Sequence, residues 1–203
     1  MRQDGAMRVT RTAQISRRTG ETDVELRLDL DGEGEGRRET GVGFFDHMLD
    51  LMARHGGLDL EVRARGDLQT GAHHTVEDTG LVLGHALHEA LGDRVGITRY
   101  GQATVPMDEA RAAAVVDVSG RPLLVWEADV PVLVIGGFET ELTEEFFRAL
   151  AGAARLTLHV RVERGGNVHH VIEAVFKAVA RALRSAIALD PRVHGVPSTK
   201  GVL

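Results

Sequence analysis

The stretch HHTVE at residues 73–77 decides the fold, because it returns as HHVIE at residues 169–173. The two copies lie 96 residues apart (169 − 73), and each opens a segment whose apolar residues follow the spacing of a helix. These residues are Leu81, Leu83, Ala86, Leu87, Ala90 and Leu91 in the first segment and Val175, Phe176, Val179, Ala180 and Leu183 in the second. We therefore expect an internal duplication in which each half ends with a helix.

Outward from the repeated motif, the two halves match element by element. Alternating stretches at 58–63 and 156–161 predict strands. Helix-like runs precede these strands, FFDHMLDLMARHG at 44–56 and TEEFFRALAGAA at 143–154. The repeat therefore extends well upstream of the histidine pairs.

Strand candidates near the start of each half continue the match. Apolar-rich stretches at 24–30 and 112–118 correspond with a shift of 88 residues (112 − 24), which aligns Glu21 with Glu109. A second, weaker strand candidate follows in each half, at 37–42 and at 123–129. Each half thus reads strand, strand, helix, strand, helix. This order predicts an α+β fold of two tandem similar halves, each a mixed β-sheet covered on one face by helices.

The duplication also divides the chain. We expect an N-terminal extension at 1–10, a first α/β half at 11–98, a second α/β half at 99–190 and a C-terminal tail at 191–203. Met7 is an alternative start to Met1, and the sequence leaves that choice open.

Composition narrows the possible classes of protein. With 203 residues, 43% hydrophobic and 27% charged, the chain is typical of a globular protein, and no apolar run approaches the roughly 20 residues that cross a bilayer. Its first residues lack the apolar core of a secretory signal, so a cytoplasmic protein is expected. The formal net charge of −6 argues against broad nucleic-acid binding. Because there is no cysteine, any metal must be bound through nitrogen and oxygen.

Helical geometry indicates how the repeated motif can bind metal. Residues four apart share a helix face, whereas adjacent residues point about 100° apart. His73 can therefore act with Glu77, but His74 points elsewhere. The same reasoning pairs His169 with Glu173 and leaves His170 unpaired.

The unpaired histidines predict two ions, each completed by the other repeat. His47 and Glu145 each lie eleven residues before the matched strands (58 − 47 and 156 − 145), so the repeat aligns them. If a pseudo-two-fold axis relates the halves, the two ligand sets are His169, Glu173, His74 and His47 for one ion and His73, Glu77, His170 and Glu145 for the other. Imidazole and carboxylate donors without sulfur suit manganese better than tetrahedral zinc.

Other interpretations remain open on the residues alone. A lone HHxxE is more often a surface or core feature than a metal site, and two aligned copies favour metal. The same ligands could activate water in a metal-dependent hydrolase, or hold together a metal-storage or structural assembly protein. The remaining histidines have no aligned ligand partner: His85, His88, His159 and His194 are expected to be structural or exposed, and His55 is undecided.

Several long strings together resemble the imidazoleglycerol-phosphate dehydratase family. They are FFDHMLDLMARHGG, HHTVEDTGLVLG, SGRP, HHVIEAVFKAVARAL and GVPSTKGVL, and the resemblance runs from about Arg11 to Leu203. It implies dehydration of D-erythro-imidazole-glycerol phosphate to imidazole-acetol phosphate in histidine biosynthesis. It further implies two manganese ions per active site that bind the substrate imidazole as imidazolate. A 24-mer with ligand sets lying across subunit contacts is also implied.

The resemblance also assigns residue roles. Glu21 matches a substrate-contacting glutamate and is the candidate acid-base group, while Glu77 and Glu173 are ligands that could share the proton transfer. The implied substrate-binding residues are Glu21, His47, His73, Arg99, Arg121, Lys177, Ser198, Thr199 and Lys200. Cationic side chains among them would bind the phosphate. Lys177 lies one helical turn beyond Glu173, which supports its place independently of the resemblance, and the tail could close over the phosphate.

Two positions depart from the family pattern. Glu145 stands where many relatives have histidine, and a carboxylate can replace imidazole on manganese. Leu51 stands where many relatives place glutamine near the substrate, so a polar contact there must be lost or supplied by another group.

Overall fold

The computed structural model describes residues 10–203. The predicted N-terminal extension, apart from residue 10, and the alternative start at Met7 lie outside the described residues. The elements of the first half are β1 (Thr12–Arg18), β2 (Thr22–Asp29), β3 (Arg38–Glu39), α1 (Gly43–Gly56), β4 (Asp59–Gly66), the 3-10 turn η1 (Leu68–Thr70) and α2 (His73–Leu91). Those of the second half are β5 (Tyr100–Met107), β6 (Ala110–Asp117), β7 (Leu123–Glu127), β8 (Val134–Ile135), β9 (Phe138–Glu139), α3 (Leu142–Ala154), β10 (Thr157–Arg164) and α4 (Val168–Ile187).

The two main sheets repeat one topology. Their strand orders are β1-β2-β4-β3 and β5-β6-β10-β7, and in both sheets only the last pair is parallel. Strands β2 and β6 start 88 residues apart (110 − 22), as the repeat predicts. The predicted α+β fold of two similar halves, each with a mixed sheet, is therefore confirmed.

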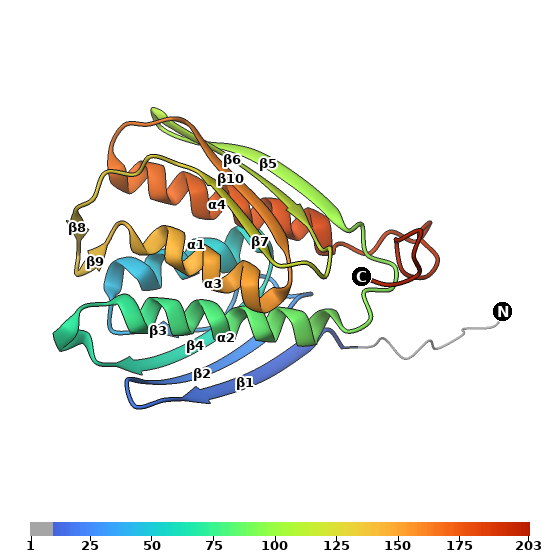
Figure 1. Cartoon of the computed structure of the whole chain (residues 1–203), viewed down its shortest axis with the longest axis horizontal. Coiled ribbons are helices and arrows are strands. Elements are labelled where there is room, and N and C mark those ends of the chain that lie inside the picture. Colours follow the sequence, from blue (N-terminus) through green and yellow to red (C-terminus); the bar gives the residue numbers. More distant parts are fainter. Residues whose placement is uncertain (1–9) are drawn as a thin grey trace.

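The helices form a layer between the sheets (Figure 1). Each sheet turns one face toward the helices, and a single apolar cluster, with Phe45, Phe146 and Phe176 fully buried, connects the two halves. Helix α1 of the first half packs on α4 of the second, and α2 packs on α3. The duplicated motifs therefore face helices of the other half. No helix within residues 10–203 is long and apolar enough to cross a membrane.

The first strand of each half was not predicted. Strand β1 pairs antiparallel with β2, and β5 pairs in the same way with β6. Both are edge strands whose outward positions are exposed and whose inward positions, apart from the buried Ala13 and Gly101, are only partly buried, so the alternation of apolar residues is weak. Hydrogen bonding to the neighbouring strand therefore defines β1 and β5. The weak candidate at 37–42 is reduced to two residues, β3, and the short hairpin of β8 and β9 was also not predicted.

Small residues let α2 and α3 approach closely. A Cβ placed on Gly84 would lie 2.6 Å from the Cβ of Ala153 and 2.7 Å from the carbonyl oxygen of Leu150. Gly80 is similarly close, 2.8 Å from the carbonyl oxygen of Phe146. The two glycines are four residues apart and therefore share one face of α2. Their packing fixes the position of the helix that begins with His73 and His74.

Candidate metal centre

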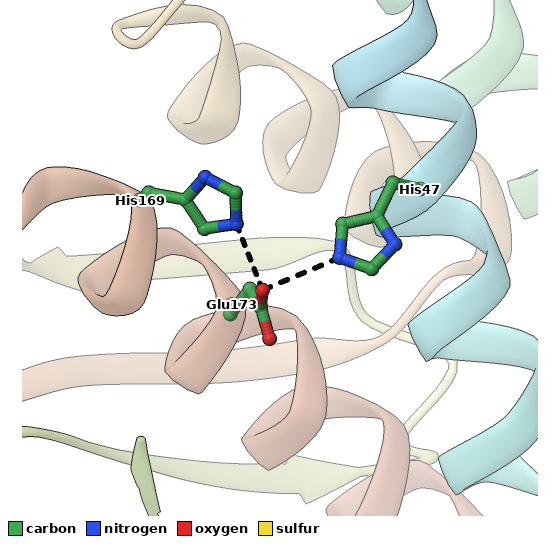
Figure 2. Close-up of side chains that lie close together, drawn as sticks. All are labelled: His47, His169 and Glu173. Carbon is green, nitrogen blue, oxygen red and sulfur yellow. Dashed lines mark hydrogen bonds and ion pairs between the residues drawn. The ribbon is translucent and has the colours of Figure 1, made fainter. Parts of the chain in front are cut away.

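Helices α1 and α4 bring together three possible metal ligands (Figure 2). The Nε2 atoms of His47 and His169 lie 3.2 and 2.8 Å from Oε1 of Glu173. One donor atom from each residue lies within 4.8 Å of the other two, close enough for all three to bind one ion. The ring of His169 also packs edge-on against Phe44, with 5.0 Å between ring centroids. Two helices that are far apart in sequence thus build one half-site.

Glu173 is the buried member of this group, with 8% of its side chain exposed. Its other carboxylate oxygen, Oε2, accepts a hydrogen bond from Nζ of Lys177 at 2.6 Å. Burial raises the pKa of Glu173, but hydrogen bonds from Lys177, His47 and His169 outweigh it and lower the pKa to about 2. The carboxylate is therefore ionised at neutral pH and ready to bind a cation.

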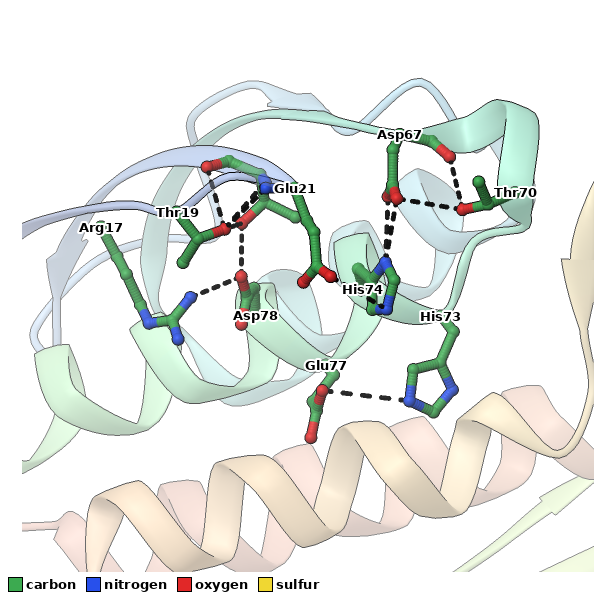
Figure 3. A network of polar contacts seen from close by, with 10 residues as sticks. Arg17, Thr19, Glu21, Asp67, Thr70, His73, His74, Glu77 and Asp78 are labelled. Carbon is green, nitrogen blue, oxygen red and sulfur yellow. Dashed lines mark hydrogen bonds and ion pairs between the residues drawn. The ribbon is translucent and has the colours of Figure 1, made fainter.

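The corresponding positions on α2 and α3 are more open (Figure 3). His73 and Glu77 lie one turn apart on α2, with 3.9 Å between Nε2 and Oε2. Glu145, predicted as their partner, lies on α3, where its carboxylate pairs with Arg148 at 3.7 Å. Among the described residues, these three side chains do not gather as tightly as the group on α1 and α4.

The second histidine of each motif points to a different set of carboxylates. Nδ1 of His74 lies 3.1 Å from both carboxylate oxygens of Asp67, and its Nε2 lies 3.8 Å from Oε1 of Glu21 (Figure 3). In the second half, Nδ1 of His170 lies 2.9 Å from Oε2 of Glu109. These hydrogen bonds raise the pKa of His74 and His170. Adjacent histidines thus diverge, as helical geometry requires.

The structure does not bring the predicted four-residue ligand sets together within one chain. His74 lies beside Asp67 and Glu21 and is not part of the group formed by His47, His169 and Glu173. His170 likewise lies beside Glu109 and Asp108. The physical reason is the helix pairing: α1 packs on α4 and α2 on α3, so each pair collects only part of a set.

The predicted phosphate-binding residues lie in two places. Lys177 is beside Glu173, whereas Arg99 binds Asp117, with Nε 2.8 Å from Oδ1, and its Nη1 donates to the carbonyl oxygen of Pro197 at 2.9 Å. Arg121 also pairs with Asp117, at 3.5 Å. Ser198, Thr199 and Lys200 follow in the tail, and Thr199 and Lys200 are exposed.

Arg99 and the tail lie at the C-terminal end of α4, far along the helix from the histidine pair at its start. The backbone N–H of Arg99 donates to the carbonyl oxygen of Ala186, seventeen residues along the helix from His169 (186 − 169). At 1.5 Å per residue this separation is about 26 Å. The tail likewise emerges at the end of α4 opposite the hairpin of β8 and β9 (Figure 1). One chain therefore keeps its histidine motifs and its tail apart.

Sequence reasoning missed three carboxylates close to the histidines. Asp67, Asp108 and Glu109 were not predicted as site residues. The alignment of Glu109 with Glu21 was a usable signal, because both occupy the turn of the first hairpin of their half. For Asp67 no motif gave a signal, since its contact with His74 depends on the path of the loop after β4.

Leu51 and the other histidines lie outside these groups. Leu51 is partly buried and packs against the apolar core, so it offers no polar contact at the centre. His159 is exposed, whereas Nδ1 of His88 accepts a hydrogen bond from Nη2 of Arg94 at 3.0 Å. For His55, burial and then the nearby charges of Lys177 and Arg181 lower the pKa.

Comparison with known proteins gives one consistent result. The sequence profile of imidazoleglycerol-phosphate dehydratase matches residues 40–183. Proteins of that name from Frankia casuarinae and Limosilactobacillus fermentum are 60% and 58% identical to the chain, over 96% and 95% of it and 100% of each relative. The crystal structure of imidazoleglycerol-phosphate dehydratase from Staphylococcus aureus aligns with a TM-score of 0.80 at 44% identity, covering 88% of this chain and 99% of that one. A second crystal structure of the same enzyme, from Pyrococcus furiosus, gives a TM-score of 0.80 at 36% identity, covering 93% of this chain and 100% of that one.

Proposed function

Because the chain belongs to the imidazoleglycerol-phosphate dehydratase family, we propose that it converts D-erythro-imidazole-glycerol phosphate to imidazole-acetol phosphate with two manganese ions per active site. The family assignment makes it a hydro-lyase of histidine biosynthesis. The identity of the metal, the substrate contacts and the assembly of the sites are the proposed parts.

The observation that carries the proposal is the group of His47, His169 and Glu173. Its donors are two imidazole nitrogens and a carboxylate oxygen, all within 4.8 Å of one another, and the carboxylate is ionised. Nitrogen and hard oxygen donors without sulfur suit manganese. His73, Glu77 and Glu145 would hold the second ion, since they occupy the matching positions of the other helix pair. Bound there, the ions would supply Lewis-acid stabilisation of negative charge on the substrate imidazole.

The reaction requires a proton to leave C2 and a hydroxyl to leave C3, which together make one water and an enol that becomes the ketone. Glu21 is the proposed group for the C2 proton. Its backbone N–H is held by the hydroxyl of Thr19 at 3.1 Å, while its carboxylate lies 3.8 Å from Nε2 of His74 and is largely exposed. A carboxylate anchored at its backbone and open at its tip is suited to move a proton.

We propose that the active site is shared between chains and that the assembly is a 24-mer. The distance of about 26 Å along α4 from His169 to Ala186, which Arg99 contacts, supports this, since one small substrate does not span that length. His74 and His170 lie apart from the other members of their predicted ligand sets, which supports it as well. Arg99, Arg121 and residues 198–200 of one chain would then bind the phosphate of a substrate whose imidazole lies near the histidines of another, beside Lys177.

A combined assay tests the proposal. Purified protein is stripped of metal, reloaded with Mn²⁺ and incubated with imidazoleglycerol phosphate, and both the keto product and free phosphate are measured. We expect keto product only with Mn²⁺ and about two ions per chain. Phosphate release without keto product would instead support the metal-dependent hydrolase. Metal-dependent assembly without turnover would support a storage or structural protein.

A further inference from the structure

A carboxylate engages Nδ1 of His74 and another engages Nδ1 of His170, and they come from different parts of the fold. We propose that Asp67 and Glu109 are positioning residues that orient these two imidazoles so that Nε2 faces the metal. The inference rests on the proposed function, because it assigns to the two histidines a role as metal ligands. An ionised carboxylate can only accept a hydrogen bond, so Nδ1 must carry a proton, and in the neutral ring that binds a metal the lone pair is then on Nε2.

Glu109 is held firmly in this role. Its Oε2 faces Nδ1 of His170 at 2.9 Å, and its Oε1 accepts from the backbone N–H of Asn167, the N-cap residue of α4, at 2.6 Å. A Cβ on the neighbouring Gly166 would lie 2.3 Å from Oε1 of Glu109, so glycine leaves room for the carboxylate. Glu109 thus ties the turn between β5 and β6 to the start of α4.

Asp67 performs the same task from another position. It directly follows β4, and both of its carboxylate oxygens lie 3.1 Å from Nδ1 of His74. The hydroxyl of Thr70 donates to Oδ2 at 3.0 Å, and the backbone N–H of Thr70 donates to the carbonyl oxygen of Asp67 at 2.8 Å. The short turn η1 therefore holds the carboxylate beside Nδ1 of His74.

The carboxylate that contacts Nδ1 comes from a different element in each half. The residue directly after the matching strand β10 is Gly165, which has no carboxylate, and there the hairpin residue Glu109 takes over. In the first half Asp67 fills the position, so the hairpin residue Glu21, the partner of Glu109 in the repeat, does not bind Nδ1. Its carboxylate instead lies on the Nε2 side of His74, at 3.8 Å. This difference explains why only one glutamate of the aligned pair is free to transfer a proton.

The test measures binding of Mn²⁺ alone to the full-length protein. In Asp67→Ala and in Glu109→Ala we expect affinity for one of the two ions to fall tenfold or more, within the roughly 10–100-fold range seen when such outer partners are lost. Glu163→Ala is the matched control, because Glu163 lies near the end of β10 and pairs with Arg111 at 2.7 Å. Its Mn²⁺ affinity should equal that of the wild type.

A double-mutant cycle separates positioning from general stability. In a His74→Ala background, Asp67→Ala should leave the affinity for the remaining ion unchanged, because Asp67 acts through His74. Asp67→Asn keeps an acceptor for Nδ1 and should lose less affinity than Asp67→Ala, and it serves as the test if the alanine variant does not fold. Unchanged Mn²⁺ affinity in the Asp67 and Glu109 variants, beside a wild type that binds two ions, overturns this inference alone. A wild type that binds no Mn²⁺ overturns the proposed metal function together with it.

Discussion

Nζ of Lys177 lies 2.6 Å from Oε2 of Glu173, one helical turn away on α4, while Oε1 of the same carboxylate faces His47 and His169. One carboxylate therefore connects the candidate metal half-site to a cation. The arrangement lets the positions of metal and phosphate be tested separately.

Lys177→Met removes the charge while keeping a long apolar stem, and its neighbour Met107 is already apolar, with Sδ 3.2 Å from Nζ. We expect kcat/KM to fall tenfold or more, because Lys177 is proposed to bind the phosphorylated substrate and a hydrogen bond to a charged group is worth about 1.5–3 kcal/mol. Mn²⁺ affinity should be retained, since Oε1 of Glu173 keeps both histidines. Glu173→Gln should lose both properties. Loss of Mn²⁺ from Lys177→Met would contradict this separation of roles.

Loss of the second histidine of either motif, His74 or His170, should remove one ion. In His74→Ala and His170→Ala we expect about one Mn²⁺ fewer per chain than in the wild type and almost no activity, because each ring is the proposed ligand of a different ion. Elemental analysis after gel filtration measures the metal content. His159→Ala, at an exposed position of β10, is the control and should bind as the wild type does. Full activity in either ligand variant would refute the two-ion proposal.

The close packing of α2 on α3 can be tested with two glycine substitutions in helices. Gly84→Ala places a methyl group 2.6 Å from Ala153 and 2.7 Å from a backbone oxygen, so the free energy of unfolding should fall by about 1–3 kcal/mol. Gly152→Ala, on the open face of α3 with nothing within 4 Å of the new Cβ, should be neutral or stabilising by up to about 1 kcal/mol. Urea unfolding compares the two variants. Equal stabilities would show that the helices can separate without cost.

Asp59 makes stability depend on acid pH. Its Oδ1 accepts from the backbone N–H groups of Glu33, Gly34 and Glu35 at 2.9, 3.1 and 2.9 Å. The bonds from Glu35 and then Glu33 lower the pKa of Asp59 below its usual 3.8. A lowered folded-state pKa gives stability that is present above the unfolded value and is lost as the pH falls through the folded one.

We therefore expect Asp59→Ala to cost about 1–3 kcal/mol near pH 7, because three N–H groups lose their acceptor. The difference from the wild type should shrink as the pH falls below about 4. Chemical unfolding of both proteins between pH 3 and 7 measures it. A difference that grows in acid would show that the sign of the pKa shift is wrong.

A substitution of Arg99 tests the proposed binding of the substrate phosphate. Arg99→Ala removes a guanidinium that is proposed to bind the phosphate, so we expect KM for the phosphorylated substrate to rise tenfold or more. Residual turnover of imidazole glycerol without phosphate should be unchanged. If the unphosphorylated compound is affected equally, Arg99 supports the fold and does not bind phosphate.

Much of the fold could be predicted because the duplicated elements have regular local patterns of apolar residues. The helix beginning at His73 has apolar residues at helical spacing, and residues 60–65 of strand β4 alternate strictly between buried and exposed. Strand β1 could not be predicted, since its residues are mostly exposed and its pairing depends on β2. The local sequence predicts an element when buried residues recur regularly along it. It fails when hydrogen bonding to a neighbouring strand determines whether the segment is a strand.

The sequence by itself determined the repeat, the divergence of His73 from His74 and the pairing of each first histidine with a glutamate one turn later, because these follow from helical periodicity. Only the tertiary structure decided that His47 joins His169 and Glu173, that Asp67 and Glu109 hold the second histidines, and that the tail lies at the far end of α4. Those relationships depend on which helices pack together and where loops end. Such long-range geometry is set by the shared core between the two sheets, and no short motif encodes it.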